Sequence, residues 1–354
     1  MPMMIDELVK APAAWMSRRG AGVVISSRVR LARNLKDAAF PGWAGEDECV
    51  RLCGNLKQAM ARLESLQHPL FLDMDKLGDT DRAVLRERNL ISAELAEKGR
   101  GSALVVAGDQ HVAVMVNEED HIRLQAVRPG LHLRSVWNRV NAIDTELEEQ
   151  VGFAFSRELG YLTACPSNVG TGLRASVMMH LSGLKLTGEV DAVLNGLGKL
   201  GLAVRGLFGE GTEAYGNMFQ ISNQSTLGES ETEIIARLTA IVKEVAQHEE
   251  NARARLMESR QTYVLDQVAR AYAVLTHAHV LNSGEAIDLL SGLRLGVELG
   301  IVKQLSIAAI NETVLFTQPG HLQRLAGKTL SPDERDMYRA ELVKSRLQQV
   351  GFEG

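Results

Sequence analysis

The chain of 354 residues is long enough for two compact domains, and its composition, 45% hydrophobic and 23% charged, is typical of a globular protein. Its formal net charge of −5 argues against nucleic acid or an anionic membrane as the main partner. The start has no signal-peptide pattern and no segment reaches the roughly 20 apolar residues of a membrane span, so we expect a cytoplasmic protein without membrane contact.

The cysteine and histidine patterns predict neither a disulfide framework nor a metal site belonging to the protein itself. The three cysteines are Cys49, Cys53 and Cys165, and the first two are separated by three residues without histidines nearby. We interpret Cys49 and Cys53 as buried apolar residues of one helix. His277 and His279 lack further ligands, which favours a surface position.

The first part of the chain predicts strands that end in polar residues. Residues 22–31 mix β-branched residues with alternation and predict a strand, followed by a helix over 45–66. Residues 103–107 and 111–116 flank a hairpin signal. The second of these strands runs directly into the polar segment 117–120, which suggests a site at that strand end.

The middle of the chain predicts two helices and a second hairpin. Residues 131–159 have helical periodicity, which 165–168 interrupts before a glycine-rich turn. We expect another helix near 174–186. The second hairpin has its arms at 202–207 and 217–222.

The last third predicts long helices. Ser230 and Glu233 form a capping box that opens one helix, and the segment 331–334 provides an N-cap, a proline and a glutamate that open another. We therefore predict a catalytic domain over 1–255 and an all-helical domain over 256–354.

A glycine pattern over 196–201 matches the G-x-G-x-x-G spacing of dinucleotide-binding proteins. That motif requires a strand before it and a helix after it, whereas the predicted strand follows here, so we favour a helix-terminating turn. A Rossmann oxidoreductase is the weakest interpretation, and the absence of a Walker A sequence excludes a P-loop kinase.

Several arginines occur in strand-like or glycine-rich contexts. Arg28 and Arg30 are two apart on a strand, so both side chains point to one face. Arg174 follows a glycine-rich turn, and Arg205 interrupts an apolar strand. Taken singly, each is typical of a salt-bridged surface residue; together they favour a polyphosphate site, because guanidinium groups bind phosphate oxygens in pairs.

Two glutamate pairs lie at the hairpin ends. Glu118 and Glu119 follow one strand, and Glu210 and Glu213 lie in the loop of the second hairpin. Such residues are often solvated turn residues, but a carboxylate can also orient a guanidinium and accept its proton.

Four blocks of sequence resemble, in order and spacing, the phosphagen kinases, which are the arginine and creatine kinases. The blocks are Ser26-Ser27-Arg28-Val29-Arg30, the segment 117–123, the segment 165–176 and the segment 205–213. The resemblance covers about residues 22–225. It implies an α+β fold with a glutamine-synthetase-like catalytic domain, in which helices flank a curved, largely antiparallel sheet, followed here by the all-helical domain.

Two features make the chain resemble the bacterial protein-arginine kinases in particular. The first block begins at residue 26 without the helical domain of about a hundred residues that precedes it in phosphagen kinases, so we expect a site open to a large substrate. The segment 335–340 resembles the R-D-x-x-R-A motif of the C-terminal helical domain. That likeness implies phosphoarginine binding by Arg335, Asp336 and Arg339 and a homodimer.

The resemblance implies a role for each matching residue. Catalytic roles are implied for Glu119, Glu210 and Cys165. ATP binding is implied for Ser27, Arg28, Arg30, Arg123, Arg174, Ser176 and Arg205. The expected reaction transfers the γ-phosphoryl group of ATP, with Mg²⁺, to arginine side chains of proteins. The expected partners are these protein substrates, a Clp-type unfoldase-protease and a zinc-binding activator.

Two alternatives remain open at this point. A kinase for free arginine or another small guanidine would use the same catalytic residues. A non-catalytic adaptor that binds phosphoarginine would need only the C-terminal motif.

Overall fold

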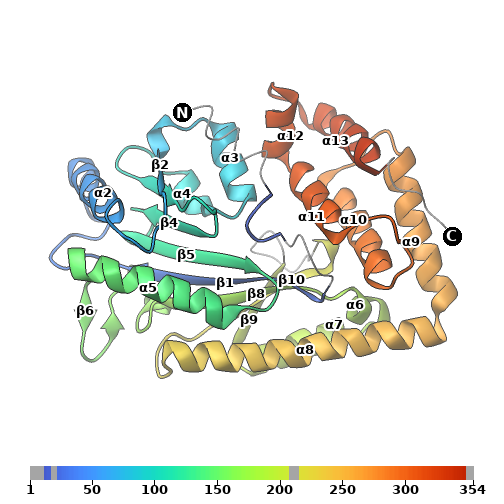
Figure 1. Cartoon of the computed structure of the whole chain (residues 1–354), viewed down its shortest axis with the longest axis horizontal. Coiled ribbons are helices and arrows are strands. Elements are labelled where there is room, and N and C mark those ends of the chain that lie inside the picture. Colours follow the sequence, from blue (N-terminus) through green and yellow to red (C-terminus); the bar gives the residue numbers. More distant parts are fainter. Residues whose placement is uncertain (1–11, 17–21, 207–214, 348–354) are drawn as a thin grey trace. The chain divides into compact units, whose positions relative to one another are not determined.

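The computed structural model describes residues 12–16, 22–206 and 215–347 (Figure 1). Among these residues an eight-stranded sheet has the order β2-β3-β4-β5-β1-β8-β10-β9, and β6 and β7 form a separate two-stranded ribbon. The strands are β1 (Val24–Arg33), β2 (Leu70–Asp73), β3 (Ala103–Val106), β4 (Val112–Val116), β5 (Ile122–Pro129), β6 (Phe155–Ser156), β7 (Gly160–Tyr161), β8 (Leu173–His180), β9 (Leu202–Gly206) and β10 (Met218–Asn223). The pairs β2–β3, β3–β4, β4–β5 and β5–β1 are antiparallel, as predicted.

Helices separate and follow the strands. The α-helices are α2 (Glu46–Met60), α3 (Asp79–Glu87), α4 (Ala93–Ala96), α5 (Leu133–Val151), α6 (Ser182–Thr187), α7 (Val190–Lys199), α8 (Glu231–Ser259), α9 (Gln261–His277), α10 (Ser283–Glu298), α11 (Ile307–Phe316), α12 (Pro319–Ala326) and α13 (Pro332–Leu347). Short 3₁₀ helices lie at Met74–Lys76, Pro166–Asn168 and Tyr215–Asn217.

Strand β1 has two different faces because its sequence alternates. Val29 and Leu31 are fully buried and lie on the same face of the strand as Ser27, whose hydroxyl accepts the backbone N–H of His132 just before α5. Arg28 and Arg30 point to the opposite face, as the alternation predicted. One face of the strand therefore builds the core, and the other is available for chemistry.

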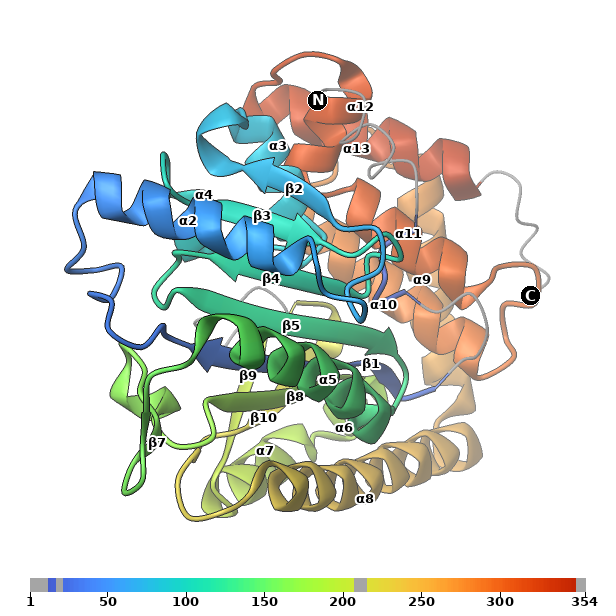
Figure 2. The same cartoon turned by 60° about the vertical axis from the view of Figure 1, so that its left-hand side comes forward.

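Helix α2 lies beside α5 over the same face of the sheet (Figure 2). Its buried residues include Leu52, Cys53 and Leu56, at the i, i+1 and i+4 spacing of a helix with one buried face. Burial raises the pKa of the Cys53 thiol to about 11, which is consistent with the predicted apolar role of this cysteine. Cys49 lies on the same helix but is only half-buried, so its predicted burial is wrong.

The predicted helix near 174–186 is wrong over its first part, because residues 173–180 form strand β8 inside the sheet, and only its last part is helical, as α6. The leucine, alanine and methionine content favours a helix, but packing between β1 and β10 decides for a strand. The predicted helix over 131–159 begins as expected and ends at Val151. Gly152, with φ +64°, ends it before the β6–β7 ribbon.

Both predicted capping boxes are present. The backbone N–H of Ser230 donates to Glu233 Oε2 at 2.8 Å at the start of α8, and that of Ser331 donates to Glu334 Oε2 at 2.8 Å at the start of α13. The glycine pattern at 196–201 ends helix α7 and leads into β9, which confirms the rejection of a dinucleotide motif.

The chain divides into two compact units that are each built from separate segments. The first unit comprises residues 1–25, 178–221 and 241–354, and the second comprises 26–177 and 222–240. This division differs from a linear cut between 255 and 256, which stays a prediction.

Helices α9, α10, α11 and α13 of the first unit share one hydrophobic core. Its fully buried members include Val268 of α9, Leu290 of α10 and Val343 of α13. These residues recur on one face of each helix, which is why the last third of the sequence reads as amphipathic helices.

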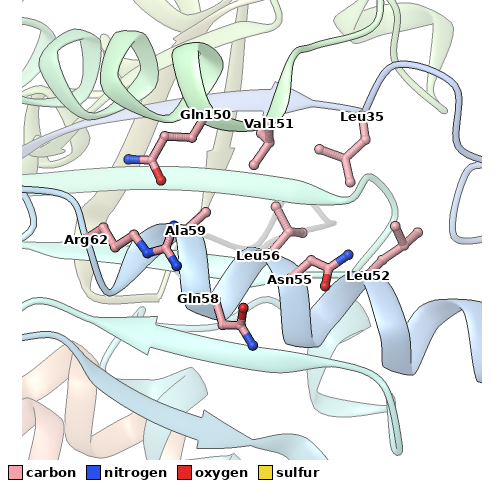
Figure 3. A pocket seen from close by; sticks show the side chains of 9 residues that line it. All are labelled: Leu35, Leu52, Asn55, Leu56, Gln58, Ala59, Arg62, Gln150 and Val151. Carbon is pink, nitrogen blue, oxygen red and sulfur yellow. The ribbon is translucent and has the colours of Figure 1, made fainter.

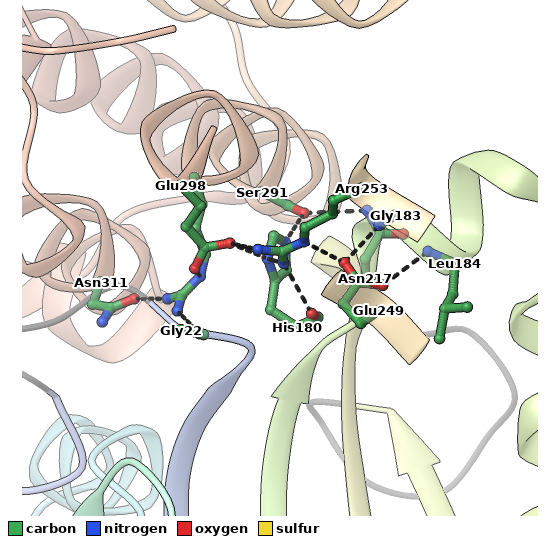
Figure 4. A network of polar contacts seen from close by, with 11 residues as sticks. Gly22, His180, Gly183, Leu184, Asn217, Glu249, Arg253, Ser291, Glu298 and Asn311 are labelled. Atoms are coloured by element: carbon green, nitrogen blue, oxygen red, sulfur yellow. Dashed lines mark hydrogen bonds and ion pairs between the residues drawn. The ribbon is translucent and has the colours of Figure 1, made fainter. Parts of the chain in front are cut away.

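A buried network of charged side chains lies within the first unit (Figure 4). Glu298 Oε2 lies 2.7 Å from Arg253 Nη1 and 3.4 Å from His180 Nδ1, and Arg294 Nε donates to Glu298 Oε1 at 3.0 Å. Ser291 Oγ lies 2.8 Å from the other ring nitrogen of His180. Each of these charges has a partner, as buried charges require.

Candidate active site

Four arginines gather on one face of the sheet in the second unit. Arg28 and Arg30 extend from β1, and Arg123 of β5 is paired in register with Ala32, which lies on the same face. Arg174 extends from β8, the other neighbour of β1. We call these four residues the arginine cluster.

The arginines of the cluster affect one another electrostatically. Burial, followed by the positive charges of Arg123 and Arg174, lowers the pKa of Arg28 to about 10. Burial and the same neighbours, together with Arg28, also lower the pKa of Arg30 well below its usual value. A bound anion would relieve this repulsion, and phosphate oxygens suit guanidinium geometry.

Polar atoms in and beside the cluster could bind a ligand. Within the described residues, Ser176 Oγ and Arg30 Nε are buried without a hydrogen-bond partner, and Ser176 is only 1% exposed. Such groups are normally satisfied. Together with the arginines they fit the phosphates of ATP, for which the resemblance predicted Ser176 and the arginine cluster.

Gly172 allows the segment before Arg174 to approach β1 closely. Its carbonyl accepts the backbone N–H of Ala32 at 3.0 Å. A Cβ atom at this position would lie 2.6 Å from the oxygen of Ala32, and φ is +64°. Because residue 172 is a glycine, the backbone just before Arg174 can lie directly against β1, and this places Arg174 in the cluster.

The polar segment after β4 forms a tight turn in which the two neighbouring glutamates differ. Asn117, with φ +55°, fixes the turn by donating from Nδ2 to the carbonyls of Cys49 (3.0 Å) and Gly101 (2.7 Å). Glu118 is 1% exposed, pairs with Arg123 at 2.5 Å and accepts a hydrogen bond from Ser92.

Glu119 is exposed to solvent and is not used to hold the turn together. Partial loss of hydration, and then the charge of Asp120, raises the pKa of Glu119. A raised pKa suits a carboxylate that accepts a proton.

Asp120 connects this turn to the segment that contains Cys165. Its Oδ1 accepts hydrogen bonds from the backbone N–H of Ala164 at 2.7 Å and from Asn34 Nδ2 at 2.6 Å. Cys165 is half-buried, and its Sγ lies 3.0 Å from Ser167 Oγ. The structure thus places Cys165 directly after a residue that is fixed to the Glu119 turn.

A cavity of about 440 Å³ opens beside Glu119. We call it the carboxylate cavity; its lining residues are Phe40, Gly42, Trp43, Glu94, Lys98, Glu118, Glu119 and Ala164. Three carboxylates and two aromatic rings are suited to a cation with an apolar stem. The polar segment 117–120 included Asp120, but no role was predicted for this residue. The aromatic residues were not predicted, because no local motif marks them.

A second cavity, of about 430 Å³, lies between α2 and the end of α5 (Figure 3). Its lining residues are Leu35, Leu52, Asn55, Leu56, Gln58, Ala59, Arg62, Gln150 and Val151. This cavity contains neither a carboxylate nor a residue of the arginine cluster, so it does not combine the two groups that phosphoryl transfer to a guanidinium needs.

Ser27, Arg205 and Glu210 need a separate account. The Ser27 hydroxyl lies on the opposite face of β1, donates to Gly130 O at 2.7 Å and accepts the backbone N–H of His132 at 2.9 Å. Arg205 is an exposed residue of β9 in the first unit. Glu210 lies outside the described residues.

The C-terminal motif lies on helix α13. Arg339 is buried and donates to the carbonyls of Thr317 (2.9 Å) and Leu281 (2.6 Å) and to Asp336. Arg335 is half-buried, and its Nη1 donates to Leu330 O at 3.4 Å. In this arrangement Arg339 stabilises the helix packing, and Arg335 is the more accessible of the two arginines.

The arginine cluster suits a phosphate, and the carboxylate cavity beside it suits a cation. Together they define a phosphotransferase whose acceptor is a guanidino group. The family model for the catalytic domain of the ATP:guanido phosphotransferases matches residues 52–252, and the model for the protein-arginine kinase McsB C-terminal domain matches residues 261–353.

Relatives match over nearly the whole chain. A protein-arginine kinase of Symbiobacterium thermophilum is 45% identical over 97% of this chain and 99% of its own length. One of Moorella thermoacetica is 46% identical over 94% of this chain and 97% of its own. The chain belongs to the ATP:guanido phosphotransferases and, within them, to the protein-arginine kinases.

Solved structures are similar in fold. The crystal structure of lombricine kinase has a TM-score of 0.58 at 24% identity and covers 69% of this chain and 70% of its own. The duplicated taurocyamine kinase of Schistosoma mansoni, with transition-state analogue components bound, has a TM-score of 0.59 at 22% identity, over 77% of this chain and 44% of its own. The predicted glutamine-synthetase-like fold, with helices around a mostly antiparallel sheet, is thereby confirmed.

Within the described residues, no helix combines the length and apolar character needed to cross a bilayer. The same part of the chain holds no group of three or more histidine, cysteine, aspartate or glutamate side chains arranged for a metal ion.

Proposed function

We propose that this protein-arginine kinase transfers the γ-phosphoryl group of ATP directly to a substrate arginine, using the arginine cluster and the carboxylate cavity as one active site. The observation that carries the proposal is the placement of Arg123, which belongs to the cluster and is paired with Glu118, a lining residue of the cavity. Phosphate and guanidinium would thus meet at neighbouring side chains.

The residues of the cluster would bind and orient the phosphates of ATP. Arg28, Arg30 and Arg174 face the transferred group, while Ser176 Oγ supplies a hydroxyl that has no other hydrogen-bond partner among the described residues. Fixed cations would stabilise negative charge that develops on the phosphoryl oxygens during transfer.

Glu119 would act on the acceptor. A guanidinium is protonated at neutral pH, so its nitrogen must lose a proton as the bond to phosphorus forms and the bond to the leaving ADP oxygen breaks. Glu119 accepts that proton, while Glu118 stays paired with Arg123 and keeps the cluster in place. Mg²⁺, when bound through phosphate oxygens, would neutralise part of the phosphate charge.

The family resemblance supports further roles that need their own tests. Glu210 would be the second carboxylate on the guanidinium, and Arg205 a further phosphate ligand. Cys165 would order the substrate. Arg335, Asp336 and Arg339 would bind phosphoarginine, and phosphoarginine binding that is unchanged in Arg335→Ala would contradict that role.

Partners and location are also proposals that derive from the resemblance. We propose a cytoplasmic homodimer that marks proteins for a Clp-type protease and works with a zinc-binding activator. Sedimentation of the purified chain tests the dimer. Degradation of an arginine-phosphorylated protein by a purified Clp protease, compared with the unphosphorylated protein, tests the marking.

The decisive experiment is ³¹P NMR of the purified protein with Mg-ATP and an arginine-rich unfolded protein or free arginine. We expect an acid-labile P–N signal on the protein substrate, which Glu119→Gln reduces by about 10²–10⁴-fold, the usual loss for a general base. Glu97→Gln is the matched control, since Glu97 is an exposed carboxylate near Glu94 that does not line the cavity.

Each other outcome identifies an alternative. A signal on free arginine alone would indicate a small-guanidine kinase, and no signal on either acceptor would favour the phosphoarginine-binding adaptor. Full activity of Glu119→Gln would contradict the proposed role of that carboxylate.

A further inference from the structure

Trp43 lines the carboxylate cavity and is unusually exposed to solvent. Its side chain is 90% exposed, although it lines a cavity that also contains Glu118 and Glu119. A tryptophan is rarely left in water, since burying an aromatic side chain stabilises a protein by about 2–3 kcal/mol. Folding alone does not account for an indole at this place.

The turn that carries Trp43 is anchored through Phe40. The backbone N–H groups of Trp43 and Ala44 donate to Phe40 O at 2.8 and 2.9 Å. The Phe40 ring meets the buried His121 ring edge-on at 6.2 Å between centroids, and His121 Nδ1 accepts the backbone N–H of Leu35 at 3.3 Å. The indole is therefore presented by a fixed turn.

The chemistry around the indole suits one side chain in particular. Glu94 and Glu119 supply negative charge, Glu118 is paired with Arg123, and Lys98 is the cation among the lining residues. A guanidinium is flat, stacks on aromatic faces and is weakly hydrated, whereas an ammonium is compact and strongly hydrated. A flat cation with an apolar stem would satisfy the ring and the carboxylates together.

We infer that Trp43 is a specificity-determining residue that stacks on the side chain of the substrate arginine while the carboxylates bind its guanidinium. This inference rests on the proposed function of the cavity. It names the substrate class more closely: an arginine that projects far enough from its polypeptide for the indole to cover its stem. Lysine at the same position would lose the planar contact.

The kinetic test compares Trp43→Ala and Trp43→Phe with the wild-type enzyme on an arginine-rich unfolded protein. We expect the KM for that substrate to rise about 3- to 30-fold in Trp43→Ala, the range that a cation–π contact of this kind represents. Trp43→Phe should retain most of the affinity, and the KM for ATP should not change. Phe155→Ala is the control, because Phe155 is 57% exposed and does not line this cavity.

A binding measurement separates this inference from the proposed function. Titration of the ATP-free protein with an arginine peptide should quench tryptophan fluorescence, the quench should be lost in Trp43→Phe, and a lysine peptide should give little change. An unchanged KM in Trp43→Ala, with Glu119→Gln inactive, would overturn the role of Trp43 and leave the kinase site intact. No phosphorylation by the wild type would instead contradict the proposed function, whatever the fluorescence shows.

Discussion

At the scale of single residues, the site depends on the different surroundings of Glu118 and Glu119. These neighbours follow the same strand, but one is buried in an ion pair with Arg123 and the other faces the cavity. Glu118 therefore stabilises the structure, and Glu119 is available to act on the substrate.

This difference predicts effects of different size on the free energy of unfolding. Glu118→Gln leaves the half-buried charge of Arg123 without its carboxylate, so we expect the free energy of unfolding to fall by about 2–4 kcal/mol. Glu119→Gln should change it by no more than about 0.5 kcal/mol, because its side chain is exposed. Urea unfolding of both variants measures the difference, and equal losses would show that Glu119 also holds the turn.

At the scale of secondary-structure elements, β1 explains why some predictions held and others did not. Alternation alone placed Arg28 and Arg30 on one face, and turn residues located the hairpin between β3 and β4. Alternation also puts Ser27 on the opposite face. The resemblance nevertheless predicted ATP binding for Ser27, because a sequence motif does not show to which face of a strand a side chain points. The strand nature of β8 was missed because it results from neighbours distant in sequence, not from its own propensity.

The two serines of the predicted ATP site should therefore behave differently. Ser27→Ala removes a hydroxyl that joins β1 to the start of α5 through Gly130 and His132, so we expect a loss of about 1–3 kcal/mol in stability and an unchanged KM for ATP. Ser176→Ala should raise the KM for ATP with little change in stability, because its hydroxyl has no partner among the described residues.

Thermal unfolding and steady-state kinetics on the same two variants check this pair of expectations. A raised KM for ATP in Ser27→Ala, without loss of stability, would restore the original assignment of Ser27 as a nucleotide ligand.

At the scale of the whole molecule, the buried network around Glu298 links stability to pH. Burial lowers the pKa of His180 to about 4. Burial alone would raise the pKa of Glu298, but the hydrogen bond with His180 and the charges of Arg294 and Arg253 outweigh it and lower that pKa to about 2. Both groups thus bind protons more weakly in the folded protein than in the unfolded chain.

Both shifts destabilise the fold in acid. The His180 contribution is complete above about pH 6.5 and is lost as the pH falls towards 4. The Glu298 contribution is complete above about pH 4.5 and is lost towards pH 2, each being on the order of a few kcal/mol. Urea unfolding should show that the free energy of unfolding falls between pH 7 and 4.5. It should fall less steeply with pH in His180→Gln.

Asp266→Asn is the control for this measurement, since it removes an exposed ion pair with Arg270 that contributes little. A slope that is the same in His180→Gln and in the wild type would show that other groups cause the acid sensitivity.

The division into units has a consequence for how the protein can be cut. The chain passes between the units at 25/26, 177/178, 221/222 and 240/241, which lie inside β1, β8, β10 and α8. Because each unit is assembled from separated stretches of chain, no single proteolytic nick can release either one whole. A shortened protein that ends at residue 240 would keep every residue of the second unit, but it would cut helix α8 and remove helices α9 to α13 of the first unit. We therefore expect kinase activity to require the polypeptide in one piece.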